Sequence, residues 1–458
     1  MMKPQSRRSG AFDPLNRLER SGLGLLLAGI IAFGVVTEIR SGGFLKRRMT
    51  DVDTYFRAAW AVRVHRDPYQ VTDSNGWHYN YPPLLAILLY PLADAPAGAS
   101  RAGLLPYPLS VAIWFILSVG FAWVGTCWLA RAFEKTSPDP RVRDQPRYCR
   151  RWWALRIIPL LVCLPALGRA LARGQVDVLL LLLLCAAGAL LAYHRRLGAG
   201  FCIGLAAALK LFPGFLLLYA IWRGRPRILL GGVLALALGM IVVPVLVMGP
   251  HFTLAAYQRF NQVLIEPALG LNHNRSRGKE LFDINRTDSN SFEAVLNNTL
   301  HIGALVKNQR PPAPTRPEKI AAWLIGLALL VVTLQLERRR RGYDAVGRNL
   351  FLGALTVLML PMIPICHPHY FCLALPLVMV LLEARWRRDQ TLPIGWPLGA
   401  VLGFFLLSHL LTVLPPFHLL RGLGLVTYGG LGLWLASLVM MWRYHDQPAP
   451  TALLEQRP

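Results

Sequence analysis

MTDVDTYFRAAWAVRVHRDPYQVTDSNGWHYNYPP, residues 49–83, is a polar and aromatic stretch in a chain that is otherwise rich in apolar residues. An apolar run at residues 21–39 precedes it, and further long apolar runs follow it up to residue 442. These runs have the lengths of helices that cross a bilayer, so the polar stretch must form a loop at the membrane surface. We therefore expect the chemistry of this protein to begin in that loop.

The composition excludes an ordinary soluble enzyme. Of the 458 residues, 54% are hydrophobic and only 16% are charged, which is far from the balance of a soluble domain. Most apolar runs have roughly 17 to 25 residues, the length that a helix needs to span a hydrocarbon core about 30 Å thick. The sequence therefore predicts an all-α, polytopic integral membrane protein.

The formal net charge of +25 comes largely from arginines that cluster at the ends of the apolar runs. This is the pattern of the positive-inside rule, so the basic balance indicates topology, and we expect no nucleic-acid partner. Counting from these clusters, we predict a membrane domain at residues 22–443 with about twelve segments. The tails at residues 1–21 and 444–458 would be cytoplasmic, with membrane lipids around the domain.

Two large external loops follow from this topology, at about residues 40–81 and 249–318, and we expect them to face each other. Lys46, Arg47 and Arg48 run against this placement, but charge bias counts for less in a long loop, and a basic cluster there would suit a lipid phosphate. Residues 154–171 are predicted to form one span. Residues 198–222 lie between two basic clusters, so this segment should enter and return, with Lys210 near its tip.

Asp51 is the leading candidate for a catalytic group. A short helix from about this residue would carry Tyr55 and Ala58 on the face of Asp51. A carboxylate at the mouth of an apolar cavity can act as a general base on an acceptor hydroxyl, and nearby cations can balance a leaving phosphate. The structural alternatives stay open: Asp51 can cap a helix, Lys210 can snorkel, and the aromatic rings can mark the interface. Asp53 stays an alternative base, although helical phase favours Asp51.

The sequence offers only a weak pattern for a metal site. Asp51-Val-Asp53 has the DxD form that can hold a divalent cation, but so short a motif arises often by chance. The seven cysteines have no metal-ligand or disulfide spacing, and His367 and His369 do not share one helix face. We expect no metal or other cofactor, with a divalent metal as the alternative.

Several motifs, in order along the chain, resemble glycosyltransferase family 87, the polyprenol-phosphate-mannose-dependent mannosyltransferases of the GT-C superfamily. The motifs are Asp51 with Tyr55 and Ala58, Asp67-Pro-Tyr69, Tyr81-Pro-Pro-Leu84, Gly174-Gln175, Gly204-Leu-Ala with Lys210 and Pro213, Asn290-x-Phe292, and Pro364 with His369-Tyr370. The chain departs from the family pattern at Asp177, where Asn is frequent, and at residues 290–292, where the family has a longer motif.

The resemblance implies a GT-C type helical bundle in the bacterial plasma membrane. It also implies inverting transfer of a sugar, expected to be mannose, from a polyprenyl phosphate donor to a lipid or glycan acceptor on the outer face. Asp51 takes the position of the family's proposed general base. The expected substrate-binding residues are Asp53, Tyr55, His65, Tyr69, Tyr81, Gln175, Lys210, Asn290, His367 and His369.

Two other classes of function can use the same polar loops. A transporter or flippase of lipid-linked sugar would need a polar cavity without chemistry. The chain shows no sequence repeat of the transporter kind, and its polar residues gather on one side, whereas alternating access needs polar groups at both faces. A structural assembly subunit would tolerate substitutions at the external polar residues.

Overall fold

The computed structural model describes residues 10–41, 50–268, 271, 277, 280, 289–338, 344–389 and 394–443. Regular structure in these residues is helical, and their only extended pairing consists of two isolated bridges, Pro14 with Cys149 and Thr72 with His78. The predicted all-α fold is therefore confirmed. The basic cluster of Lys46, Arg47 and Arg48 lies outside the described residues.

The elements, in chain order, are α1 (Arg17–Ser41), α2 (Thr50–Arg63), α3 (Pro83–Leu88), η1 (Tyr90–Leu92), α4 (Tyr107–Lys135), α5 (Pro140–Arg143), α6 (Arg150–Val162), α7 (Leu164–Arg173), α8 (Asp177–Ala192), α9 (Arg196–Leu209), η2 (Phe212–Leu217), α10 (Leu218–Trp222), α11 (Pro226–Ala237), η3 (Leu238–Val242), α12 (Val243–Met248), α13 (Pro250–Phe260), η4 (Asn261–Ile265), α14 (Glu266–Ala268), α16 (Phe292–Leu300), α17 (Ile302–Val306), α18 (Arg316–Arg338), α19 (Ala345–Met362), η5 (Pro368–Ala374), α20 (Leu375–Asp389), α21 (Trp396–Leu411), η6 (Pro415–Phe417), α22 (His418–Gly422) and α23 (Leu425–Arg443).

In the described part of the chain, seven helical stretches are long and apolar enough to cross a membrane, or eight if the bent pair α6 and α7 is one span. Four shorter apolar helical stretches accompany them: α8, α9, η2 with α10, and α21. The predicted span at residues 154–171 is not a straight helix, because α6 and α7 meet at 66°. Pro165 stands in the first turn of α7 and Pro159 lies inside α6, and each lacks the N–H that would continue the ladder.

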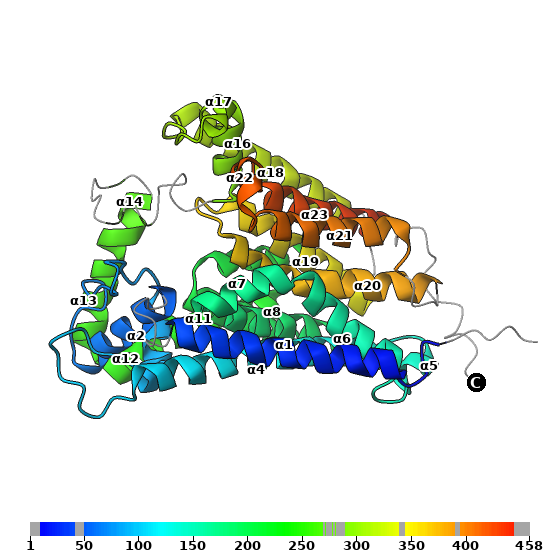
Figure 1. Ribbon diagram of the computed structural model, residues 1–458, viewed down its shortest axis with the longest axis horizontal. Coiled ribbons are helices and arrows are strands. Elements are labelled where there is room, and N and C mark those ends of the chain that lie inside the picture. Colours follow the sequence, from blue (N-terminus) through cyan, green and yellow to red (C-terminus); the bar gives the residue numbers. More distant parts are fainter. Residues whose placement is uncertain are drawn as a thin grey trace, which may run out of the picture.

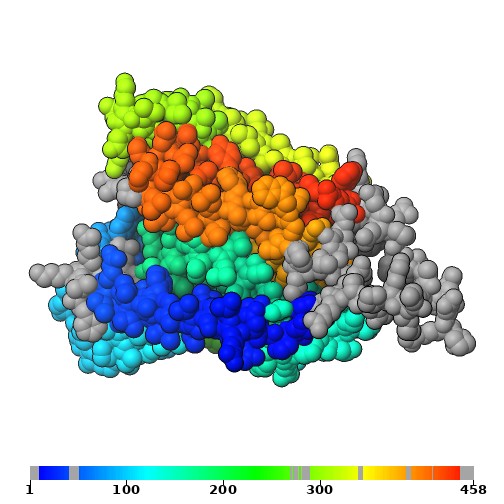
Figure 2. All heavy atoms as spheres, turned by 45° about the vertical axis from the view of Figure 1, so that its right-hand side comes forward, coloured from blue at the N-terminus to red at the C-terminus, as the bar shows by residue number. Residues whose placement is uncertain are grey.

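The core of the bundle is formed by α19 and by the continuous stretch of η5 and α20. In the apolar 18-residue stretch of each, 89% of the residues are buried inside the protein, whereas only 6% are buried in the corresponding stretch of α1. Figure 1 shows α1 and α4 together along one edge of the bundle, and Figure 2 shows α1 as a dark blue strip on the outside. Leu25 and Ile31 of α1 expose 75% and 59% of their surface, as expected for a helix that faces lipid.

The two ends of the bundle differ in content. In Figure 1, α2, α13 and α14 lie at one end, while α5 and the C-terminal end of α20 lie at the other. At the end with α2, α13 and α14, described residues of the two polar regions, about residues 40–81 and 249–318, contact each other as predicted. Arg277 donates to the carbonyl of Tyr69, and the Glu280 carboxylate lies 2.7 Å from His78 Nδ1 and accepts from Asn80 at 2.9 Å.

Close packing of α9 on α11 connects the two ends. A Cβ added at Gly200 would lie 1.8 Å from the Ile228 carbonyl oxygen, and one at Gly204 would lie 2.2 Å from that of Gly232. Only glycine permits such an approach of two backbones, as in the small-residue packing of membrane helices. The residue numbers of both helices rise from the first pair to the second, so α9 and α11 run parallel. Helix α9 begins at Arg196 and ends next to Lys210, at the end of the bundle where the two polar regions meet.

Candidate active site

Asp51 lies in the first turn of α2, where the helix dipole favours a carboxylate. Its Oδ2 lies 3.8 Å from Nε of Arg173, and its side chain is 26% exposed. No hydrogen-bond donor among the described residues reaches this oxygen. Burial raises the pKa of Asp51, whereas the charges of Arg173 and Lys210 oppose that rise. This buried oxygen therefore has free capacity to accept a proton from a bound substrate.

Tyr55 follows Asp51 by one helical turn, as predicted, and is buried. Its hydroxyl donates to Gln175 Oε1 at 2.9 Å and lies 3.0 Å from the hydroxyl of Tyr81. The rings of Tyr55 and Tyr81 meet edge to face with centroids 5.1 Å apart. The structure therefore brings together three of the predicted site residues next to Asp51.

Gly174 determines how Gln175 enters this cluster. It caps the C-terminus of α7 with φ of 64°, in the left-handed region that glycine adopts most easily. Its carbonyl accepts a hydrogen bond from Trp114 Nε1 at 2.8 Å, which ties the turn to α4. The chain then turns into α8, so that Gln175 and Asp177 are both buried within the bundle.

A second cluster lies around Asp177, at the start of α8. Lys210 Nζ donates to Asp177 Oδ1 at 2.9 Å, and His369 Nε2 lies 3.4 Å from Asp177 Oδ2. All three side chains are less than 10% exposed. The Lys210 ammonium also lies 3.9 Å from the ring centroid of Tyr370 and 5.3 Å from that of Tyr81, within cation–π range. Tyr81 therefore joins the Asp51 cluster to the Lys210 cluster.

The histidines at the start of η5 complete this side of the site. The rings of His367 and His369 stack with centroids 5.2 Å apart, and the Tyr370 ring stands edge-on to both. Asn290 lies next to the residue that precedes His367, because its N–H donates to the carbonyl of Cys366 at 2.7 Å. Its own carbonyl accepts from Thr427 Oγ1 at 2.6 Å.

Asp53 and Tyr69 form hydrogen bonds within the first loop, whereas His65 joins neither cluster. Asp53 is fully buried, accepts from the N–H and hydroxyl of Ser74, and pairs with Arg57 at 3.3 Å. The Tyr69 hydroxyl donates to the Tyr81 carbonyl at 3.0 Å, whereas His65 is exposed beside the ring of Phe252.

The two carboxylates of the DxD motif do not converge. Residues two apart on a helix point to different sides, so Asp51 faces Arg173 while Asp53 faces Ser74. Over the described ranges, no three His, Cys, Asp or Glu side chains gather as they would around a metal ion. The residues present therefore do not fit a two-carboxylate metal site at this motif.

Arg173 and Tyr370 are not among the site residues expected from the sequence, and Asp177 is expected there only as a polar residue of an external turn, without a binding role. A signal existed for Asp177, since a carboxylate that begins an apolar helix needs a buried cation, and Lys210 is a lysine inside an apolar run. Arg173 and Tyr370 gave no comparable signal, because arginines and aromatic rings at the ends of spans are common for topological reasons.

Comparison with known proteins identifies the family of this chain. Residues 79–361 match the model of glycosyltransferase family 87. A polyprenol-phosphate-mannose-dependent alpha-(1-2)-phosphatidylinositol mannoside mannosyltransferase of Mycobacterium tuberculosis is 26% identical over 317 residues. That alignment covers 68% of this chain and 63% of the relative, so the chain spans less than two thirds of that protein.

Among solved structures, the crystal structure of ArnT from Cupriavidus metallidurans bound to undecaprenyl phosphate aligns with 93% of this chain and 77% of that one, with 15% identity and a TM-score of 0.38. The family match alone spans more than half of the sequence and includes Tyr81, Gln175, Asp177 and Lys210. The chain therefore belongs to glycosyltransferase family 87.

Proposed function

We propose that this chain is an inverting glycosyltransferase that transfers mannose from a polyprenyl phosphate to a lipid or glycan acceptor on the outer face of the bacterial plasma membrane. The carrying observation is the pair of joined clusters at one end of the bundle. In the first cluster, Asp51 next to Arg173 supplies a base. In the second cluster, Lys210 with Asp177 and His369 supplies a buried cation, and its ammonium lies 5.3 Å from the ring centroid of Tyr81. The family match and the mycobacterial relative support the reaction class and the donor.

In this reaction Asp51 accepts the proton of the acceptor hydroxyl while that oxygen forms a bond to the anomeric carbon. The bond between this carbon and the phosphate oxygen breaks, and its electron pair leaves on the polyprenyl phosphate. Attack opposite the leaving group inverts the configuration. Because phosphate is a good leaving group, a single base suffices.

Lys210 is placed to balance the charge that develops on this phosphate. An ammonium has three N–H donors, and Asp177 takes one of them at 2.9 Å. The carboxylate thus fixes the position of the ammonium and leaves donors for a substrate oxygen. A cation held in a buried site stabilises developing charge more strongly than one in water. Tyr55, Tyr81 and Gln175 would bind the sugar through their hydroxyl and amide groups.

An apolar groove of about 540 Å³ offers a place for the polyprenyl tail. It shares Phe212 with the site, since the ring of this residue lies 5.4 Å from the Lys210 ammonium and stacks on Tyr370 at 5.5 Å. The tail of a polyprenyl phosphate bound at Lys210 would extend past Phe212 into this groove. The groove is lined by Phe212, Phe215, Ile320, Trp323, Leu324, Leu327, Leu330, Met359, Met362 and Ile363.

The topology belongs to the same proposal. Seven long spans, the bent pair and four shorter apolar helical stretches are consistent with about twelve membrane segments in a GT-C type arrangement. The arginine clusters favour cytoplasmic tails and external loops that carry Asp51 and Asn290. Metal-independent catalysis is also proposed, on the ground that Asp51 and Asp53 point apart.

The test is transfer of labelled mannose from polyprenyl-phospho-mannose to a membrane lipid extract by the purified protein. Asp51→Asn should lower the rate by about 10²-fold or more, the usual contribution of a general base, and EDTA should leave the wild-type rate unchanged. Asp144→Asn is the control, because this exposed acid follows α5 at the opposite end of the bundle, outside the two clusters. Full activity of Asp51→Asn would refute the assignment of the base.

A further inference from the structure

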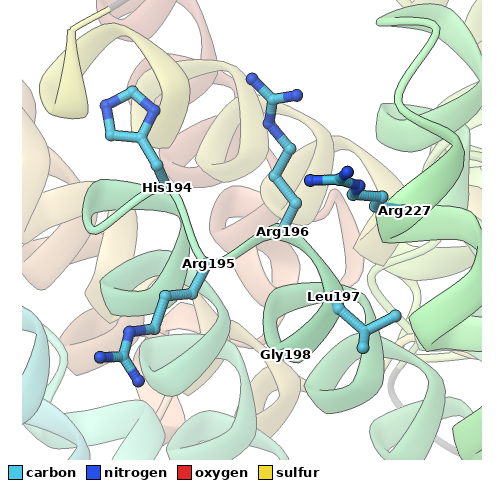
Figure 3. Close-up of a pocket in the computed structure, with 6 residues that line it drawn as sticks. All are labelled: His194, Arg195, Arg196, Leu197, Gly198 and Arg227. Atoms are coloured by element: carbon cyan, nitrogen blue, oxygen red, sulfur yellow. The ribbon is translucent and has the colours of Figure 1, made fainter.

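A basic cavity of about 490 Å³ lies at the end of the bundle opposite Asp51. It is lined by His194, Arg195, Arg196, Leu197, Gly198 and Arg227, and none of these is acidic. Figure 3 shows the side chain of Arg227 directed towards that of Arg196, whereas Arg195 points away. These two arginines come from different helices, α9 and α11, and both line the cavity.

These arginines keep their charge available. In the described part of the chain, Arg196 and Arg227 form no ion pair, unlike Arg223 nearby, which binds Glu337 at 2.6 Å. The pKa of His194 is lowered by burial and by the charges of Arg348, Arg196 and Arg225. The imidazole Nε2 lies 3.2 Å from Nη2 of Arg348, a geometry in which neutral histidine accepts a hydrogen bond. The local field is thus strongly positive, and guanidinium groups bind phosphate oxygens well.

The cavity is separated from the transfer site by the length of α8. Sixteen residues of α8 separate Asp177 from this end, which is roughly 24 Å at 1.5 Å per residue. Apolar side chains continue from the cavity along the bundle: Leu197 is 46% exposed, and Leu230, one turn after Arg227, is 52% exposed. A free inorganic anion would make no favourable contact with these apolar side chains, whereas the acyl chains of a phospholipid would pack against them.

We propose that this cavity binds the phosphate of an anionic phospholipid from the leaflet opposite the transfer site, with Arg196 and Arg227 as its ligands. Basic pockets between membrane helices are suited to such headgroups. The site is separate from the Asp51 and Lys210 clusters. The proposal does not depend on the transferase reaction, so its test uses lipid binding alone.

The experiment is native mass spectrometry of the purified full chain titrated with phosphatidylglycerol, cardiolipin or phosphatidylcholine. Wild-type protein should retain the anionic lipids at lower concentrations than phosphatidylcholine. Arg196→Gln/Arg227→Gln should weaken the binding of anionic lipids at least tenfold, and Arg196→Lys/Arg227→Lys should restore part of it. Excess inorganic phosphate should not displace the bound lipid.

Arg17→Gln/Arg143→Gln is the control, because it removes two exposed arginines at the same end of the bundle and should leave lipid binding unchanged. Equal thermal unfolding temperatures would show that the variants are folded. Unchanged binding in the Gln variant, or equal retention of phosphatidylcholine, would overturn the site. Displacement of the lipid by inorganic phosphate would overturn the assignment to a phospholipid.

Discussion

At the residue scale, Arg173 is expected to set the pH at which Asp51 works. Burial raises the pKa of Asp51, and the positive charge of Arg173 opposes that rise. The base must be ionised, so kcat/KM should fall as the pH drops through this raised pKa, above the ordinary value of about 3.9. Arg173→Gln should raise the pKa further and move the acid limb of the kcat/KM profile to higher pH.

The measurement compares kcat/KM against pH for wild type and Arg173→Gln. A shift of the limb is independent of any loss of substrate affinity, which would lower the whole profile equally. A limb that stays in place, or moves to lower pH, would show that Arg173 does not act on the base.

Asp177 and Lys210 are expected to depend on each other for stability. Both are buried, and their 2.9 Å contact neutralises two charges inside the bundle. Removing one partner of a buried pair costs about 3 to 5 kcal/mol, because the other charge is left uncompensated. Lys210→Met should therefore lower the thermal unfolding temperature markedly, and Asp177→Asn/Lys210→Met should recover much of the loss. Both variants should lack transfer activity, and a single variant as stable as wild type would contradict the coupling.

At the scale of elements, the contact of α9 with α11 is expected to position Lys210. A Cβ at Gly200 would meet the backbone of Ile228 at 1.8 Å, so Gly200→Ala must push the two helices apart. The expected result is a lower unfolding temperature together with lower transfer activity. Gly120→Ala in α4 is the control, since a Cβ there meets no atom within 4 Å, and alanine is the better helix former. Equal behaviour of the two variants would argue against this role of the contact.

The bend between α6 and α7 shows which features of an element can be predicted. The sequence shows an apolar run long enough to span a membrane, and it shows Pro159 and Pro165, residues that can break a helix. Whether a proline only distorts a helix or turns it by 66° depends on the neighbours that pack around the break. Similarly, α3 begins at Pro83 because proline costs nothing at a helix N-terminus, but its burial depends on tertiary contacts.

At the scale of the whole molecule, the orientation in the membrane is open to a direct test. Asn75 lies in the Asp51 loop and Asp144 follows α5 at the opposite end, and both are exposed. A membrane-impermeant thiol reagent should label Asn75→Cys in intact cells but Asp144→Cys only after permeabilisation. The unmodified chain gives the background, since its described cysteines are buried or half-buried. The reverse pattern would place the site on the cytoplasmic side.

The sequence by itself determined the class of the molecule, and it predicted several residues that the structure brings together near Asp51. Long apolar runs are unfavourable in water, and a backbone in lipid must form its hydrogen bonds internally. Composition and run length therefore indicate an all-helical membrane bundle. The one-turn spacing of Asp51 and Tyr55 is likewise local and could be read directly. The tertiary structure alone decided that Lys210 meets Asp177 and His369, and that Asp53 holds Ser74 instead of sharing a site with Asp51. The reason is that these partners are far apart in the chain, and only the packing of whole helices determines which buried charges meet.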